Sequence, residues 1–185
     1  GGINTTKQDW YYNFIQEIDK KTKGAIDGLG MQSHIGTDVT PPKKVIEILN
    51  RFAALNKEIA ISEFTLDIMD DEDLRAKYTR DFMIATFSNP AVKEFLFWGF
   101  YKPMHPKAPL VDENYQLTKM GQAYYDLVFN KWMTKSAKTT DEMGLFFDKG
   151  FYGTYEFTLK HEGKTFNGTF EVLPNQANKL KINLQ

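Results

Sequence analysis

A carboxylic acid, an imidazole and an indole each stand at the end of a short apolar run in this sequence. Glu63 lies in "IAISEF", His34 follows "GLGMQS", and Trp98 follows "FLF". In a parallel α/β sheet, functional groups collect at the carboxyl ends of the strands. Because adjacent strands lie about 4.8 Å apart, we expect His34 and Glu63 to be in contact. An aromatic plate beside a carboxylate suits a sugar ring, which offers an apolar face and a rim of hydroxyl groups.

Taken alone, each of these residues has a simpler explanation. A strand-end acid such as Glu63 often pairs with a nearby lysine, His34 suits a hydrogen-bonded structural histidine, and Trp98 in "FLFWGF" suits a core position. The functional interpretation depends on their coincidence at three neighbouring strand ends. Gly99, directly after the indole, would let the backbone turn tightly there.

The elements that must position these residues alternate between helices and strands. Apolar residues recur at helical spacing in several stretches, and "T-P-P" at residues 40–42 places proline in a first helical turn. Asp9 is expected to cap the first helix, and one stripe of the second helix is expected to consist of Val45, Ile46, Leu49, Phe52 and Leu55. The predicted order is helix 10–22, strand 25–31, helix from 40, strand 58–63, helix 70–88, strand 91–99 and helix 117–132.

This alternation predicts an α/β fold with a parallel sheet covered by helices. Only three strands are present, and a three-stranded parallel sheet with two hydrophobic edges invites further pairing. We therefore expect this part of the chain to be a piece of a larger α/β structure, or to find its missing neighbours in a partner.

The character of the sequence changes after residue 134. The polar stretch "TKSAKTTDEM" reads as a linker. It is followed by β-like segments at 144–147, 153–160, 164–172 and 179–184, with a hairpin turn expected at 161–164. The predicted domains are therefore residues 1–134 and a small antiparallel, β-sandwich-like module at 135–185, which is too small for comfortable stability alone.

Composition excludes several kinds of partner and site. The 185 residues carry a formal net charge of −1 and include no cysteine. This argues against a nucleic-acid partner and against a basic membrane-binding surface, and it excludes disulfides and thiolate metal sites. The acidic stretch at 67–74 lacks the glycine and the ligand spacing of a calcium loop, so an acidic helix start explains it better. We expect no metal ion and no cofactor.

The runs "GLGMQSHIG", "IAISEF" and "FLFWGF", in this order and spacing, resemble the last three strands of glycoside hydrolase family 10, the (β/α)8-barrel xylanases. The resemblance covers residues 10–132. It implies the C-terminal portion of a (β/α)8 TIM barrel followed by the small β module, in an extracellular enzyme that acts on xylan or a related β-glycan. The β module itself resembles modules appended to some xylanases only weakly.

The resemblance also implies roles for individual residues. Glu63 matches the nucleophile of a retaining double displacement, and His34 matches the residue that orients it. Gln32 and Trp98 match residues around the sugar at the cleavage site, and Tyr101 and His105 lie on the following loop and are expected to bind substrate. The acid/base glutamate of the family lies in an Asn-Glu-Pro motif, which does not occur here. We therefore expect the chain to hold half of the catalytic machinery and to associate with a missing N-terminal barrel half or with itself.

Two departures from the family pattern bear on function. The aspartate that the family has two residues after the nucleophile is Thr65 here, with Asp67 two residues further along the same face. The loop "FYKPMHPKAP" has no tryptophan, so the sugar platform is altered, and the sequence supports glycoside hydrolysis more directly than it supports xylan as the substrate. Two other functions stay open: a carbohydrate-binding protein without catalysis, and a structural role for the β module.

Overall fold

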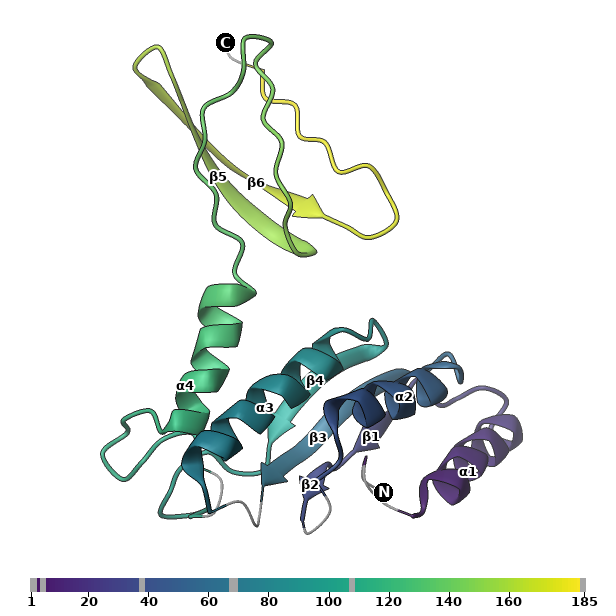
Figure 1. Ribbon diagram of the computed structural model, residues 1–185. Coiled ribbons are helices and arrows are strands. Elements are labelled where there is room, and N and C mark those ends of the chain that lie inside the picture. Colours follow the sequence, from purple (N-terminus) through teal and green to yellow (C-terminus); the bar gives the residue numbers. More distant parts are fainter. Residues whose placement is uncertain (1–2, 4–5, 37–38, 67–69, 107–108, 184–185) are drawn as a thin grey trace. The chain divides into compact units, whose positions relative to one another are not determined.

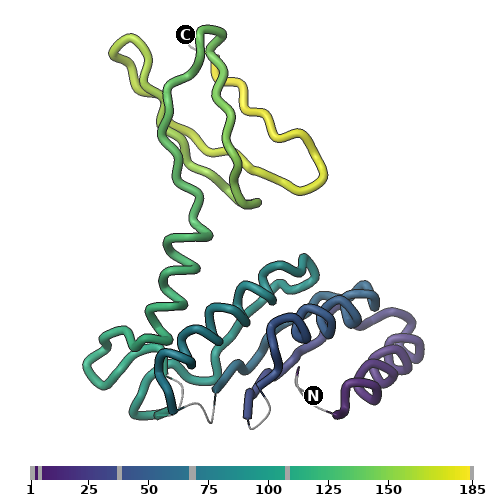
Figure 2. Tube along the Cα trace, viewed as in Figure 1, coloured from purple at the N-terminus to yellow at the C-terminus, as the bar shows by residue number. Residues whose placement is uncertain are grey.

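The computed structural model describes residues 3, 6–36, 39–66, 70–106 and 109–183. The chain divides into two compact units, Gly1–Leu127 and Val128–Gln185 (Figure 1; Figure 2). The domain bounds that the sequence suggests, 1–134 and 135–185, stay a prediction. None of the helices in the described part of the chain is long and apolar enough to cross a membrane.

The first unit contains a four-stranded parallel sheet with β3 (Glu58–Leu66) at its centre. One side of β3 pairs with β1 (Gly28–Met31) and then with β2 (His34–Ile35), which follow one another along the chain. The other side pairs with β4 (Val92–Phe97). The predicted parallel sheet is therefore confirmed, although the strand predicted at 25–31 begins at Gly28, and β2 is an additional strand that was not predicted.

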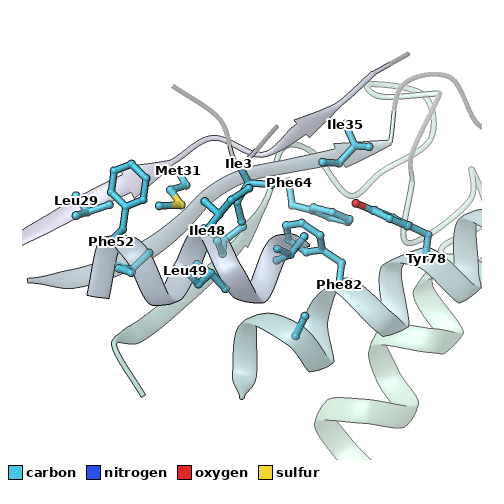
Figure 3. Packing of buried hydrophobic residues seen from close by; sticks show 14 of the residues in the cluster. Ile3, Leu29, Met31, Ile35, Ile48, Leu49, Phe52, Phe64, Tyr78 and Phe82 are labelled. Atoms are coloured by element: carbon cyan, nitrogen blue, oxygen red, sulfur yellow. The ribbon is translucent and has the colours of Figure 1, made fainter. Parts of the chain in front are cut away.

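Two helices, α2 (Pro42–Ala53) and α3 (Glu72–Phe87), cover one face of this sheet, and α1 (Gln8–Lys21) lies beside β1 (Figure 1). The apolar core fills the space between that face and the two helices (Figure 3). Its buried side chains include Leu29, Met31, Ile48, Leu49, Phe52, Phe64, Tyr78 and Phe82. Burial of this surface holds the strands, and hence their carboxyl ends, in fixed positions.

Side-chain caps set the beginnings of two helices. The side chain of Asp71 accepts hydrogen bonds from the N–H groups of Asp73 and Leu74, at 2.8 and 3.1 Å, at the start of α3. Thr118 caps α4 (Lys119–Tyr125), which continues as the π-helical stretch η1 (Asp126–Lys131). Both caps satisfy N–H groups that a helix cannot pair internally.

Two local predictions in the helices are wrong. Asp9 does not cap α1, since it lies in the first turn, where it pairs with Arg51 of α2. In α2, Ile46 is 37% exposed whereas Ile48 is 3% exposed, so the buried stripe includes Ile48 instead. The helical spacing itself favours Ile48, because Val45, Ile48, Leu49 and Phe52 follow the i, i+3, i+4, i+7 pattern of one helix face, and Ile46 lies off that face.

The predicted TIM barrel portion is confirmed only in part. Strands and helices alternate as such a barrel requires, but the sheet is open. Within the described residues, no strand pairs with the outer edge of β1 or with that of β4. The sheet therefore has two free edges.

The second unit contains one antiparallel hairpin, formed by β5 (Gly153–His161) and β6 (Lys164–Val172). The hairpin turn at 161–164 is confirmed, with Glu162 and Gly163 at positive φ. On β5, Tyr155, Phe157 and Leu159 share one face, and the ring of Tyr155 stacks on Phe170 of β6 at 5.3 Å.

The two other predicted strands of the module are wrong. Residues 144–147 and 179–183 are not strands, and residue 184 lies outside the described part. The segment 134–151 instead runs out and back before β5 (Figure 2). At its tip, the Asp141 carboxylate accepts from the N–H groups of Met143 and Leu145, at 3.0 and 2.8 Å, and so takes backbone groups that a strand would need. The expected sandwich is therefore not formed by regular strands.

Candidate functional site

Backbone hydrogen bonds join three neighbouring segments near the carboxyl edge of the sheet. The N–H of Glu63 donates to the carbonyl of Gln32 at 3.0 Å, and the N–H of Trp98 donates to the carbonyl of Phe64 at 3.1 Å. These residues come from the β1–β2 junction, from β3 and from the end of β4. The carboxyl edge of the sheet thus brings together the segments on which the predicted site residues lie.

A one-residue bulge in β3 positions Glu63. On one side, Met31 pairs with Ile61 and His34 pairs with Thr65, so β3 has one residue more between these two pairs than the β1–β2 segment has. On the other side, Ile61 pairs with Phe95 and Phe64 pairs with Phe97, so β3 again has one residue more than β4. The extra residue falls at Ser62–Glu63, where both residues are half-buried and the strict alternation of β3 stops. Bulges of this kind turn a side chain away from the direction that a regular strand would give it.

The imidazole of His34 lies between the side chains of Glu63 and Thr65. Its Nε2 is 3.0 Å from Oε2 of Glu63, and its Nδ1 is 3.0 Å from Oγ1 of Thr65. An ionised carboxylate can only accept, so the Nε2 hydrogen donates to Glu63. The predicted contact between His34 and Glu63 is therefore confirmed, whereas Asp67 lies outside the described residues.

Both partners of this contact remain accessible. The side chain of His34 is 36% exposed and that of Glu63 is 27% exposed. Thr65, in contrast, is buried at 5% exposure. A half-buried carboxylate that is oriented from one side and open on another is chemically suited to attack an electrophilic carbon or to accept a proton.

The indole of Trp98 lies next to this pair and is not part of the core. The centroid of its ring is 6.1 Å from that of the His34 ring, and the two ring planes make an angle of 88°. Trp98 is 51% exposed, which excludes the simpler explanation of core packing. Gln32, the other residue that the family resemblance places near the sugar, is exposed at the same edge. An open aromatic face beside a carboxylate can stack on the apolar face of a sugar ring.

The loop after β4 places Tyr101 and His105 differently. Tyr101 stacks on Tyr115 with ring centroids 4.9 Å apart and planes 8° apart. Partial burial raises the pKa of Tyr101, and its hydrogen bond with Tyr115 adds to this rise. His105 lies against Trp98, with ring centroids 6.4 Å apart. The expected roles of Tyr101 and His105 in binding substrate stay predictions.

Sequence reasoning missed two features of this site. Tyr115 stacks on Tyr101 from the turn "DENY", where it has a φ of +58°, and a tyrosine in a polar turn gives no signal of such a partner. The bulge at Ser62–Glu63 is equally invisible, because "IAISEF" reads as one uniform strand. Among the described residues, no group of three or more acidic or histidine side chains is arranged to hold a metal ion.

The family model described as glycosyl hydrolase family 10 matches residues 2–125 of the chain. Among curated proteins, the anti-sigma-I factor RsgI6 of Acetivibrio thermocellus is 33% identical over 143 residues, which cover 75% of this chain and 18% of the relative. Endo-1,4-beta-xylanase B of Neocallimastix patriciarum is 30% identical over 94 residues, which cover 50% of this chain and 11% of the relative.

Solved structures give the same relationship. Xylanase 10B from Thermotoga petrophila, determined in complex with xylobiose, is similar with a TM-score of 0.58 and 30% identity, over 69% of this chain and 43% of that one. The chain thus spans less than half the length of each of these three relatives.

Proposed function

Because this chain belongs to glycosyl hydrolase family 10, we propose that it is the C-terminal part of a retaining glycoside hydrolase that cleaves β-1,4-xylan-type polysaccharides. The observation that carries the proposal is the contact of His34 Nε2 with Glu63 Oε2 at 3.0 Å, beside the exposed indole of Trp98. A xylan-type substrate is supported by the similarity to xylanases, one of which was determined with xylobiose.

In this proposal Glu63 is the nucleophile. Its carboxylate attacks the anomeric carbon and forms a glycosyl-enzyme intermediate, while the bond to the leaving-group oxygen breaks. The hydrogen bond from His34 holds the attacking carboxylate in one orientation, and Thr65 holds the opposite side of the imidazole. Trp98 packs on the apolar face of the sugar, and Gln32 lies near its hydroxyl groups.

In this proposal, the second catalytic carboxyl group comes from outside these 185 residues. Retention requires a second carboxyl group about 5–5.5 Å from the nucleophile, protonated when it assists the leaving group. The family motif that would carry it, Asn-Glu-Pro, does not occur in these 185 residues. We propose that an N-terminal barrel half in a longer chain supplies it and also covers the open edge of β1. An extracellular location, where xylan is found, also belongs to the proposal.

The test compares a longer natural chain that contains these residues with its Glu63→Gln variant on defined xylo- and gluco-oligosaccharides. We expect cleavage of xylo-oligosaccharides with retained anomeric configuration by NMR, and a loss on the order of 10⁴-fold or more in the variant. Unchanged turnover in Glu63→Gln would exclude this carboxylate as the nucleophile. The 185-residue chain alone should show no appreciable hydrolysis of the same natural substrates, since general acid assistance is missing.

A second candidate is recognition of a β-glycan without turnover, within a regulatory protein. The observation that favours it is the match to an anti-sigma-I factor over 75% of this chain, a larger share than the 50% matched to the xylanase of Neocallimastix patriciarum. Binding of xylo-oligosaccharides by the longer chain, with no cleavage and no effect of Glu63→Gln on affinity, would select this candidate over the enzyme.

A further inference from the structure

A tight turn after β4 places the imidazole of His105 directly on Gly99. The N–H groups of Met104 and His105 both donate to the carbonyl of Tyr101, each at 3.0 Å. Gly99 has a φ of +84°, and a Cβ at this position would lie 2.1 Å from Cδ2 of His105. Any side chain at position 99 would collide with the imidazole, so His105 can lie here only because residue 99 is a glycine.

Backbone bonds on both sides hold this turn in place. The N–H groups of Leu110 and Val111 donate to the carbonyl of Phe100, at 2.8 and 2.9 Å, and the N–H of Lys102 donates to the carbonyl of Val111 at 3.0 Å. The ammonium of Lys102 also pairs with Glu113 at 3.2 Å. The position of His105 is therefore set by the backbone of the loop, independently of the indole that it contacts.

The indole of Trp98 contacts two imidazoles. The ring centroid of His105 lies 6.4 Å from that of the indole, at an interplanar angle of 67°. The ring centroid of His34 lies 6.1 Å from it, at an interplanar angle of 88°. Edge contacts of this kind favour one ring orientation. An indole that is 51% exposed would otherwise sample several rotamers, which a bound sugar would have to freeze out.

We propose that His105 is a positioning residue, which fixes the indole of Trp98 beside Glu63 and acts on a bound sugar only through that indole. The packing part of this proposal stands on the contacts of Gly99, Trp98 and His105. Its consequence for sugar binding rests on the proposed function above.

The packing part is tested on this chain labelled with 5-fluorotryptophan. The sequence has three tryptophans, Trp10, Trp98 and Trp132, so the ¹⁹F spectrum should contain three resonances, and Trp98→Phe identifies one of them. We expect His105→Ala to shift and broaden the Trp98 resonance, and His105→Phe, which keeps a planar ring, to leave it narrow. His161→Ala, in the hairpin of the second unit, is the matched control and should leave all three resonances unchanged.

The Trp10 resonance reports whether the first unit is folded. A Trp98 resonance that stays unchanged in His105→Ala, with Trp10 also unchanged, overturns the proposal. If His105→Ala disturbs the Trp10 resonance as well, the spectrum of His105→Phe decides. A narrow, unshifted Trp98 resonance in His105→Phe supports the proposal. A broadened Trp98 resonance in His105→Phe, with the Trp10 resonance unchanged, overturns it.

The sugar part is tested by titrating xylobiose into the same labelled proteins. We expect His105→Ala to weaken binding by about threefold to tenfold, as for the loss of one aromatic contact. The double variant His105→Ala/Trp98→Ala should bind no more weakly than Trp98→Ala alone, because His105 acts through the indole. A further loss in the double variant would show that His105 touches the sugar itself. If neither the unsubstituted chain nor the longer natural chain binds xylobiose while the ¹⁹F pattern is as expected, the sugar-binding function fails and the positioning role stands.

Discussion

Nε2 of His34 lies 3.0 Å from Oε2 of Glu63, and this contact joins the start of β2 to the bulged part of β3. The two residues are 29 positions apart in the sequence. The contact forms because the bulge turns Glu63 toward the imidazole, while Thr65 holds the other ring nitrogen at 3.0 Å. An oriented, half-exposed carboxylate is the feature from which the proposed chemistry follows.

Replacing His34 should impair chemistry more than binding. In the longer natural chain, His34→Ala removes the donor to Glu63 and frees the carboxylate to rotate, so we expect kcat on xylo-oligosaccharides to fall by about 10²-fold with a smaller change in KM. Steady-state kinetics measure both parameters. Thr65→Ser keeps a hydroxyl for Nδ1 and serves as the conservative control, with activity close to that of the unsubstituted chain. Equal activity of His34→Ala and the unsubstituted chain would contradict this role.

Tyr78→Phe should destabilise the first unit. The hydroxyl of Tyr78 donates to the carbonyl of Thr40 at 2.7 Å in a buried position, and burial raises its pKa, so it stays protonated at ordinary pH. Loss of this donor leaves a buried carbonyl unpaired, at a cost of about 1–3 kcal/mol in the free energy of unfolding. Urea denaturation measures the difference. Tyr152→Phe, at a residue that is 67% exposed, should change stability little. The same small effect at Tyr78 would disprove the prediction.

Thr79→Val should stabilise the chain. The side chain of Thr79 is fully buried in α3, and its hydroxyl has no hydrogen-bond partner within the described structure. Valine has the same shape without the buried hydroxyl, so we expect a gain of about 1 kcal/mol in urea denaturation. Thr86→Val is the matched control, because the buried hydroxyl of Thr86 donates to the carbonyl of Met83 at 2.9 Å. The prediction would be contradicted if Thr86→Val raised the free energy of unfolding or if Thr79→Val lowered it.

The pair of Asp19 and Lys57 should make stability depend on pH. Oδ2 of Asp19 lies 2.9 Å from Nζ of Lys57, and its hydrogen bond to Lys57 lowers the pKa of Asp19. A lowered pKa in the folded state means that the carboxylate stabilises the protein above its ordinary pKa near 4, and that this contribution is lost as the pH falls through the folded-state value.

The pH dependence is measured by urea denaturation of the unsubstituted chain and of Asp19→Asn between pH 7 and pH 3. The unsubstituted chain should be more stable at neutral pH, and the difference should shrink as the pH falls below about 4. Lys57→Met removes the partner and should abolish most of this dependence. A difference that stays constant over the whole range would show that the ion pair is not its origin.

The free edges of the sheet should cause self-association. With no strand paired to the outer edges of β1 and β4 in the part that the structure describes, other chains can add to them. Light scattering should show a mass that rises with concentration. Leu96→Lys, at an exposed position of β4, should reduce the association, because an edge lysine opposes strand pairing. A monodisperse monomer at high concentration would refute the prediction.

The sequence by itself determined the alternating helices and strands of the first unit, the β5–β6 hairpin, and the place of Trp98 directly after a strand. These follow from local signals, namely apolar periodicity, turn residues and strand alternation, which act within a few residues. The predicted strand end at Glu63 is wrong, because β3 continues to Leu66, and His34 is the first residue of β2.

Only the tertiary structure decided the bulge at Ser62–Glu63, the contact of His34 with Thr65, and the position of His105 on Gly99. The structure also showed that residues 144–147 and 179–183 are not strands. The bulge and the contact of His34 with Thr65 depend on a segment that arrives from 31 residues away in the sequence. The missing strands instead follow from local side-chain bonds to the backbone, as when Asn178 binds both backbone groups of Leu173 at 2.9 Å. Register and packing are contacts between distant parts of the chain, so local patterns cannot fix them.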